Sequence, residues 1–366
     1  MQDSFNNREL HFQDMTLHIF NPEHDLALAS GLANFTAPHA GRQLRHDLGW
    51  LPALWADGLV LTDDAEQARR ATLRRKLATT LFADKGQVAS IAVDRIEPWG
   101  WDAALRSQLL RMGLSERLMP TEAEIDTLRH LSHRRTAASL LPRLQVDGQT
   151  VGEAHECTTT GEVEKAFMRH GSVVLKAPWS SSGRGVRFVA TAEAMKQPQL
   201  QGWLRNTLER QQSVMVEPCY NKVKDFGLEF MSDGHGHVAY VGLSLFHTQN
   251  GFYTGNIIAT ETAKRQRLSR YATLPLVDDM AHRIETLTAQ LMDGCYAGPF
   301  GVDMMVVRQQ GITLLHPCVE LNLRRTMGHV AIAMNSRLNP TADDEVRHVM
   351  RIESTEKQYK LRIKRL

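Results

Sequence analysis

The sequence lacks the features that mark several large classes of protein. Its four cysteines, among 366 residues, form no Cys-x-x-Cys pair, so neither a disulfide framework nor a common zinc motif is predicted. No apolar run approaches the roughly 20 residues that span a bilayer. Residues 1–15 are polar and have no apolar core of a secretory signal. We therefore expect a cytoplasmic protein that does not enter a membrane.

The sequence also lacks a large excess of positive or negative charge. The chain has 43 Lys and Arg against 41 Asp and Glu, a formal net charge of +2. No strong attraction to nucleic acid or to a membrane follows from this balance. Residues 347–366 are the exception, with seven Lys or Arg and two Glu. Their alternating pattern predicts an edge strand or a docked basic tail, and a solvated or dimer-contact role is favoured over nucleic-acid binding.

The N-terminal third alternates between strand-like and helix-like segments. Apolar runs at residues 16–20, 58–61 and 88–93 are typical of strands, and residues 65–82 and 101–113 have a helical pattern. Such βα alternation predicts a small Rossmann-like α/β domain that ends near residue 120.

Two strand-like segments late in the chain carry an unusual set of polar residues. GPFGVDMMV contains Asp303, and VELNLRRT contains Glu320, Asn322 and Arg324. The last three are spaced two apart, so on a strand their side chains point to one face. Two carboxylates and an amide oxygen are ligands that Mg²⁺ prefers, and a guanidinium beside them binds phosphate or a charged substrate. This pattern indicates a Mg-nucleotide site.

A second segment, residues 172–189, has the pattern of a strand, a polar loop and another strand. Lys176 lies on the first strand, where it can reach phosphates bound by the loop. The loop is neither a Walker motif nor a Rossmann glycine motif. Its small residues allow backbone N–H groups to approach phosphate oxygens, and its hydroxyls and guanidinium are further donors. The loop consists of Ser180, Ser181, Ser182, Gly183, Arg184 and Gly185.

Together these segments, in this order, resemble the ATP-grasp superfamily, which includes carboxylate–amine ligases such as biotin carboxylase, D-alanine ligase and glutathione synthetase. The resemblance covers residues 132–328. It implies that Lys176 contacts the α and β phosphates and that residues 180–185 form a lid over the triphosphate. Glu217 resembles the acid that holds the adenine, and Asp225 an acid that contacts the ribose.

The same resemblance implies the metal ligands and the cofactors. Asp303, Glu320 and Asn322 resemble the ligands of Mg²⁺, for which Mn²⁺ is an alternative, and Arg324 the arginine that contacts phosphate or substrate. The implied nucleotide is ATP. Where the family usually has a lysine near residue 134, this chain has arginines, of which Arg134 is preferred to its neighbour.

The sequence pattern and the resemblance together predict a division of the chain. We expect a preceding α/β domain at residues 1–120 and the small ATP-grasp subdomain, with the lid loop, at residues 121–213. The subdomain with the metal site follows at residues 214–340, and a basic C-terminal tail at residues 341–366.

Two polar clusters are candidates for the substrate site. NPEHD follows the first strand and supplies Asn21, Glu23 and His24, although Asp25 in the same segment is also a suitable cap for the next helix. HTQNGFYTGN supplies His247 and Asn256; the alternative for this segment is a surface hairpin with an Asn-Gly turn.

The expected activity is an ATP- and Mg²⁺-dependent carboxylate–amine ligase that acts through an acyl-phosphate, with Lys176 and Arg324 as catalytic residues. Two alternatives use the same nucleotide residues: a kinase that phosphorylates a hydroxyl, and a protein that binds ATP without turnover. A homodimer is expected only by analogy with the family. The sequence identifies neither the carboxylate nor the acceptor.

Overall fold

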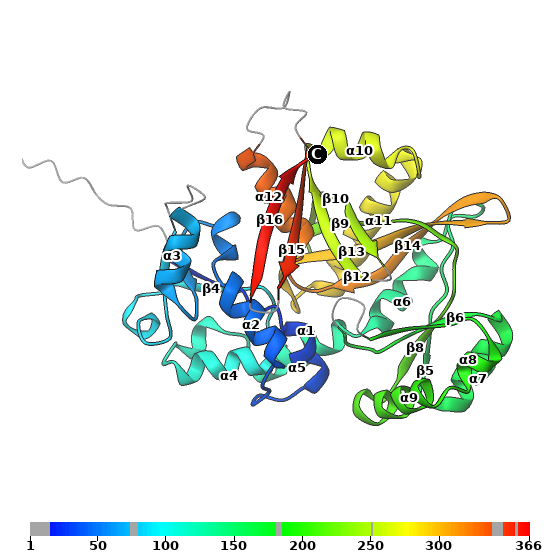
Figure 1. Cartoon of the computed structure of the whole chain (residues 1–366), viewed down its shortest axis with the longest axis horizontal. Coiled ribbons are helices and arrows are strands. Elements are labelled where there is room, and N and C mark those ends of the chain that lie inside the picture. Colours follow the sequence, from blue (N-terminus) through cyan, green and yellow to red (C-terminus); the bar gives the residue numbers. More distant parts are fainter. Residues whose placement is uncertain (1–14, 74–79, 181–184, 250–251, 339–346, 356–357) are drawn as a thin grey trace, which may run out of the picture.

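The computed structural model describes residues 15–73, 80–180, 185–249, 252–338, 347–355 and 358–366. These residues form a mixed α/β protein with four sheets of four strands each (Figure 1). The four cysteines are all free. Within the described ranges, no helix is both long and apolar enough to cross a membrane.

The N-terminal sheet is parallel, with the strand order β3-β2-β1-β4. Its central strand β1 is buried along its whole length and pairs with β2 and β4. This arrangement confirms the predicted Rossmann-like α/β domain. The elements of this part are β1 (Thr16–Ile19), α1 (His24–Ser30), α2 (His39–Leu48), a 3₁₀ turn (Leu51–Leu54), β2 (Leu59–Leu61), α3 (Ala65–Leu73), β3 (Leu81–Ala83), a 3₁₀ turn (Val88–Ser90), β4 (Arg95–Pro98), α4 (Ala103–Arg111) and a 3₁₀ turn (Glu116–Leu118).

Two predictions for this part were wrong. The strand expected at residues 88–93 is a 3₁₀ turn, because the side chain of Asp84 accepts hydrogen bonds from the backbone N–H of Gly86 and Gln87 and turns the chain there. The helix expected at residues 65–82 is shorter than predicted, because Leu81 and Phe82 belong to strand β3, which pairs with β2. Residues 74–79 lie outside the described part.

Helices α5 (Glu122–Leu131) and α6 (Arg134–Leu144) follow. Helix α5 begins with a capping box, in which the Thr121 hydroxyl accepts from Glu124 N–H and the Glu124 carboxylate accepts from Thr121 N–H. Helix α6 packs with strand β14 and buries Leu140, Leu141 and Leu144 in the largest hydrophobic core.

The sheet that carries Lys176 is antiparallel, with the order β5-β8-β6-β7. Its core is formed by apolar residues of the strands and of the helices α7 and α9, including Val163 and Leu204. In Figure 1 this unit lies at the lower right, away from the N-terminal sheet. Its elements are β5 (His155–Cys157), α7 (Thr160–His170), β6 (Val173–Lys176), β7 (Val186–Val189), α8 (Ala192–Met195), α9 (Pro198–Gln211) and β8 (Val214–Pro218).

The sheet that carries Asp303 and Glu320 is also antiparallel, with the order β10-β9-β13-β14. Phe226, Phe230 and Phe300 are fully buried on it, against α11. Its elements are β9 (Lys222–Asp233), β10 (Val238–Ser244), α10 (Glu261–Leu268), α11 (Leu274–Met292), β13 (Ala297–Gln309) and β14 (Ile312–Asn322).

The fourth sheet contains the C-terminal segment. Strand β12 (Phe252–Ile258) pairs with β11 (Phe246–Gln249) on one side and with β15 (His348–Ser354) on the other, and β16 (Tyr359–Arg365) is an edge strand. Of the two alternatives for the basic tail, the edge strand is therefore the one found. Helix α12 (Met327–Leu338) lies beside this sheet and β10 (Figure 1).

The capping box of α5 generates the first prediction. Replacing Thr121 by Ala removes an acceptor for an N-terminal N–H of the helix, and we expect the free energy of unfolding to fall by about 1 kcal/mol. Urea unfolding followed by circular dichroism measures it. Thr127→Ala is the matched control, because the Thr127 hydroxyl donates only to a carbonyl of its own helix. Equal losses in the two variants would show that the cap contributes nothing specific.

Candidate nucleotide and metal site

Strand pairing brings the predicted metal ligands together on one face of a sheet. Asp303 of β13 lies opposite Glu320 of β14, and Gly301 lies opposite Asn322. Directly paired residues share a face, so both carboxyls and the amide point the same way. The Asn322 Nδ2 donates to Asp303 Oδ2 at 3.4 Å. The three predicted ligands therefore share one face of the sheet.

A third carboxylate, which the sequence analysis did not single out, lies on the same face. Glu229 of β9 is opposite Gly301 on the other side of β13. It is 3% exposed, and its Oε2 lies 3.0 Å from His329 Nδ1 without accepting a hydrogen bond from any described group. Gly301 and Gly328 leave the space that this carboxylate fills, since a Cβ at Gly328 would meet Glu229 Oε1 at 1.8 Å. One signal in the sequence could have identified Glu229. Asp225, Gly227 and Glu229 are spaced two apart, as expected for residues that share one face of a strand.

The crowded carboxylates change the ionisation of Asp303. Burial raises the pKa of Asp303 to about 8, and the negative charges of Glu320 and Glu229 act in the same direction. Such a carboxyl holds its proton at neutral pH unless a cation is bound beside it. The donor set is two carboxylates and one amide oxygen, with a third carboxylate next to them. This chemistry fits Mg²⁺ or Mn²⁺, which take hard oxygen ligands.

Arg134 joins this acidic face to the sheet that carries Lys176. From the first turn of α6, its Nη2 lies 2.9 Å from Glu320 Oε1 and donates to Ser180 Oγ at 3.1 Å. Its Nε donates to the carbonyl of Ala177 at 3.0 Å. Arg135, in contrast, is half-exposed and faces Glu156 at 3.4 Å. Of the two arginines weighed from the sequence, Arg134 is the one beside the predicted site.

Lys176 and Glu217 form a buried ion pair on neighbouring strands. Glu217 of β8 lies opposite Val174 of β6, so its side chain shares a face with Lys176 two residues on. Lys176 Nζ donates to Glu217 Oε2 at 2.6 Å, and each side chain is only 9% exposed. The residues predicted to contact the phosphates and the adenine are thus adjacent to each other.

Arg324 reaches across to the N-terminal domain. Its Nε and Nη2 donate to the two carboxylate oxygens of Asp25 at 2.8 and 2.9 Å, and its Nη2 also donates to Asn322 Oδ1 at 3.1 Å. Asp25 lies in the first turn of α1 and was weighed as a cap for that helix; its carboxylate instead forms a two-pronged pair with a residue 299 positions away. A bidentate pair fixes both position and orientation of the guanidinium.

The other N-terminal candidates are engaged within their own domain. Asn21 donates to the Gly100 carbonyl at 2.8 Å and to Asp102 at 3.2 Å, and His24 Nδ1 lies 3.3 Å from the same carboxylate. Glu23 is paired with Arg45 at 2.8 Å. His24 also lines a small pocket, together with Asp25, Ser180, Glu320, Asn322 and Arg324.

The remaining candidates lie around strands β9, β11 and β12. Asp225 accepts from Lys222 and from the Thr248 hydroxyl, both at 2.6 Å. Asn256 is buried, donates to Ser244 Oγ at 2.9 Å and accepts from the Tyr253 hydroxyl at 2.5 Å. Burial lowers the pKa of His247, and the positive charges of Lys224 and Arg267 lower it further.

Most of the predicted lid lies outside the described residues, namely Ser181, Ser182, Gly183 and Arg184. The two ends of the loop are described. Ala177 N–H donates to the Gly185 carbonyl at 2.8 Å, and a Cβ at Gly185 would meet the Ser180 side chain at 2.4 Å. A glycine is therefore needed at residue 185 for the close approach of Ser180.

The chain was compared with protein families, curated proteins and solved structures. No protein-family model matches the chain, and no curated protein matches its sequence. Among solved structures, the biotin carboxylase domain of the 2-oxoglutarate carboxylase of Hydrogenobacter thermophilus is 12% identical. The match covers 93% of this chain and 75% of that one, with a TM-score of 0.51.

Two further structures are similar over most of the chain. N5-carboxyaminoimidazole synthetase of Staphylococcus aureus is 12% identical, over 93% of this chain and 83% of its own, with a TM-score of 0.48. D-alanyl-alanine synthetase A of Vibrio cholerae is 13% identical, over 88% and 92%, with a TM-score of 0.44. The assignment rests on the biotin carboxylase domain: the chain has the ATP-grasp fold with an N-terminal α/β domain, as predicted.

The crowding around Asp303 predicts how stability depends on pH when no metal is present. The pKa of this carboxyl is about 8 in the folded chain, against about 3.9 in an unfolded one. Below about pH 4 both states hold the proton. Above it, the unfolded state releases the proton first, so folding loses up to about 1.4 kcal/mol per pH unit until the folded pKa is passed.

Asp303→Asn removes this loss. In EDTA, we expect the free energy of unfolding of the variant, relative to wild type, to rise from about pH 5 to about pH 8. Urea unfolding at several pH values measures it, and the exposed Asp293→Asn is the control with a constant difference. A constant difference for Asp303→Asn as well would contradict the raised pKa.

The pair of Asp25 and Arg324 yields a further prediction, since their side chains are only 18% and 16% exposed. Arg324→Gln leaves a largely buried carboxylate without its partner, and we expect a loss of about 3 kcal/mol in unfolding free energy. Adding Asp25→Asn should recover part of it. A double-mutant cycle in urea unfolding measures the coupling. The exposed pair of Glu66 and Arg70 is the matched control, with at most about 0.5 kcal/mol expected; equal coupling in both cycles would refute the prediction.

Proposed function

We propose that the chain is an ATP- and Mg²⁺-dependent ligase that joins a carboxylate to an amine or a related nucleophile. The observation that carries the proposal is the oxygen-rich face of Asp303, Glu320 and Asn322, joined by Arg134 to the sheet that holds Lys176. The fold supports it, because the Hydrogenobacter thermophilus domain was solved with MgADP and bicarbonate. The substrate class proposed is a small molecule or a peptide.

In this proposal Asp303, Glu320 and Asn322 hold Mg²⁺, which when bound neutralises charge on the triphosphate. Lys176 turns from Glu217 toward the phosphates. The loop at residues 180–185, which follows the strand of Lys176, and Arg134 from α6 hold the same group. Ser181, Ser182, Gly183 and Arg184 would supply the donors of the lid and exclude water. Glu217 binds the adenine and Asp225 the ribose.

In this reaction the protein positions the reactants and stabilises charge, and it forms no covalent bond with them. The substrate carboxylate attacks the γ-phosphate, the bond to the β-phosphate oxygen breaks, and an acyl-phosphate and ADP form. The nucleophile then attacks the acyl carbon, and inorganic phosphate leaves. Arg324, fixed by Asp25, orients the acyl-phosphate. The acceptor region extends from the pocket at His24 toward His247 and Asn256.

ADP formation in the presence of pooled carboxylates and amines tests this proposal. We expect Asp303→Asn and Glu320→Gln each to lower ATP turnover by at least about 100-fold, because each removes a charge that holds the metal. Glu164→Gln, on the exposed face of α7, is the control with unchanged turnover. Free phosphate as a product supports the ligase, whereas a phosphorylated product without free phosphate identifies a kinase. Near-wild-type turnover in both variants would disprove the metal assignment.

A further inference from the structure

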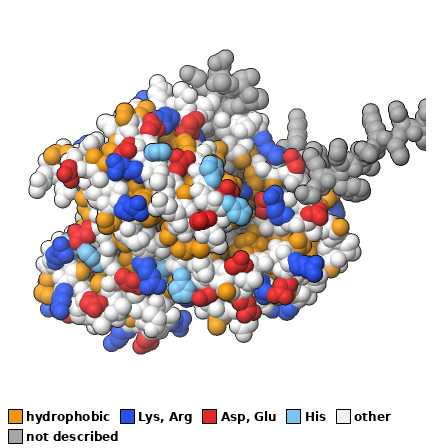
Figure 2. Space-filling model, turned by 180° about the vertical axis from the view of Figure 1, so that it is seen from behind, with side chains coloured by type: hydrophobic (Ala, Val, Ile, Leu, Met, Phe, Trp, Pro, Cys, Tyr) orange, Lys and Arg blue, Asp and Glu red, His pale blue; other side chains and the backbone are white. Residues whose placement is uncertain are grey.

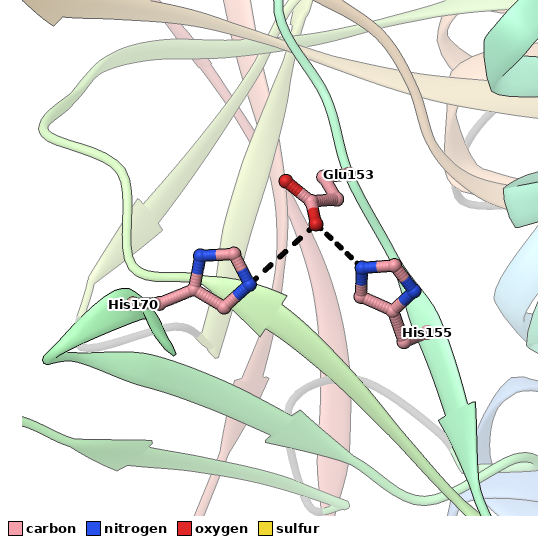
Figure 3. Close-up of side chains that lie close together, drawn as sticks. All are labelled: Glu153, His155 and His170. Carbon is pink, nitrogen blue, oxygen red and sulfur yellow. Dashed lines mark hydrogen bonds and ion pairs between the residues drawn. The ribbon is translucent and has the colours of Figure 1, made fainter. Parts of the chain in front are cut away.

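Three possible metal ligands converge outside the proposed ATP site. Glu153 lies in the link between α6 and β5, His155 is the first residue of β5, and His170 is the last residue of α7. Glu153 Oε1 lies 2.5 Å from His155 Nε2 and 3.6 Å from His170 Nε2. Figure 3 shows both rings directed at this carboxylate from opposite sides, and the three ligand atoms lie within 4.8 Å of one another.

His170 is the member of the cluster that most needs a partner. Its side chain is only 12% exposed, and its Nε2 is buried without a hydrogen bond to any described group. A buried polar nitrogen without a hydrogen bond is costly, unless an ion or a water binds it. This nitrogen faces the carboxylate of Glu153 at a distance longer than a hydrogen bond, which leaves room for an ion between them.

The ligand types define the class of metal. Two imidazole nitrogens and one carboxylate oxygen form a typical catalytic zinc set, in which water takes the fourth position. Imidazole ligands favour Zn²⁺, Ni²⁺ or Cu²⁺, whereas Mg²⁺ and Ca²⁺ favour oxygen ligands alone. The cluster is therefore chemically distinct from the oxygen-rich face of Asp303 and Glu320.

The geometry needs one adjustment. Around a tetrahedral Zn²⁺, ligand atoms lie roughly 3.3 Å apart, which is close to the distance between Glu153 and His170. The hydrogen bond from His155 must open, and the His155 side chain, at 45% exposure, has room to move. Arg169 Nη2 lies 3.4 Å from the same carboxylate oxygen, but its side chain is 66% exposed and can turn to solvent.

We propose that Glu153, His155 and His170 bind one Zn²⁺-like transition-metal ion, with an open position for water. The ion would replace the hydrogen bond between Glu153 and His155 and satisfy the buried Nε2 of His170. It would hold the link before β5 to the end of α7, where Arg169 and His170 already contact Glu153.

The link between α6 and β5 connects two sheets, so an ion bound to it would affect how the sheets are joined. Val151 N–H donates to the Leu315 carbonyl of β14 at 2.9 Å, so the start of the link belongs to the sheet of Asp303. His155 pairs with Val216 of β8, so its end belongs to the sheet of Lys176. A metal ion at Glu153 would stiffen the connection between the two sheets. That this connection matters for nucleotide binding rests on the proposed function; the metal site itself does not.

Zinc binding to the 366-residue protein without an affinity tag tests the proposal. The protein is stripped with EDTA, dialysed and titrated with Zn²⁺ by calorimetry in excess Mg²⁺, which occupies oxygen-only sites. We expect one Zn²⁺ per chain, bound at least about 100-fold more weakly by His155→Ala and by His170→Ala, because each removes a ligand. Glu153→Gln, which keeps the shape but loses the charge, should also bind more weakly.

His282→Ala is the matched control, since His282 is an 81% exposed surface histidine on α11 and its loss should leave Zn²⁺ binding unchanged. Circular dichroism checks the fold of each variant. In wild type, the side-chain nitrogen resonances of His155 and His170 should shift when Zn²⁺ is added, a readout that needs no variant. Absence of these shifts, or equal Zn²⁺ affinity in wild type, His155→Ala and His170→Ala, would overturn the proposal.

Discussion

The crowding of carboxylates around Asp303 is the constraint on which the rest of the structure depends. Asp303, Glu320 and Glu229 share one face of the antiparallel sheet, and burial with mutual repulsion raises the pKa of Asp303 to about 8. Carboxyls packed this closely remain together in a folded protein when one of them keeps its proton or when a cation faces them. The guanidinium of Arg134, from α6, faces Glu320, and the ring of His329, from α12, lies 3.0 Å from Glu229. The acidic face thus determines which elements must meet there.

The same constraint connects parts that are distant in the sequence. Arg134 also holds the Ala177 carbonyl and the Ser180 hydroxyl, which brings the base of the predicted lid to the acidic face. Arg324 is held by Asp25 of the N-terminal domain. On the face seen in Figure 2, Lys or Arg and Asp or Glu side chains are interspersed, in keeping with the formal net charge of +2. A cation bound among the carboxylates would relieve the repulsion that remains.

The features that the sequence predicted correctly depend on residues close together in the chain, and the pairings that it missed join residues far apart. Glu320 and Asn322 were placed on one strand face, and Lys176 on the strand before the loop, because strand alternation is local. The capping box of Thr121 and Glu124 is likewise a four-residue pattern. The pairing of Asp25 with Arg324, and that of His24 with Asp102, join residues 299 and 78 positions apart, which no local pattern encodes. The expected strand at residues 88–93 failed because turn contacts of Asp84 outweighed a short apolar run.

The central claim is that the oxygen-rich face and Lys176 together bind Mg-nucleotide. Calorimetric titration of ATP into the purified protein, in Mg²⁺ and again in EDTA, tests it most directly. The account predicts one ATP per chain in Mg²⁺, with binding at least about 10-fold weaker in EDTA and in a folded Lys176→Met variant. Absence of binding to the folded wild type in Mg²⁺, or equal affinity with and without the metal, would contradict it.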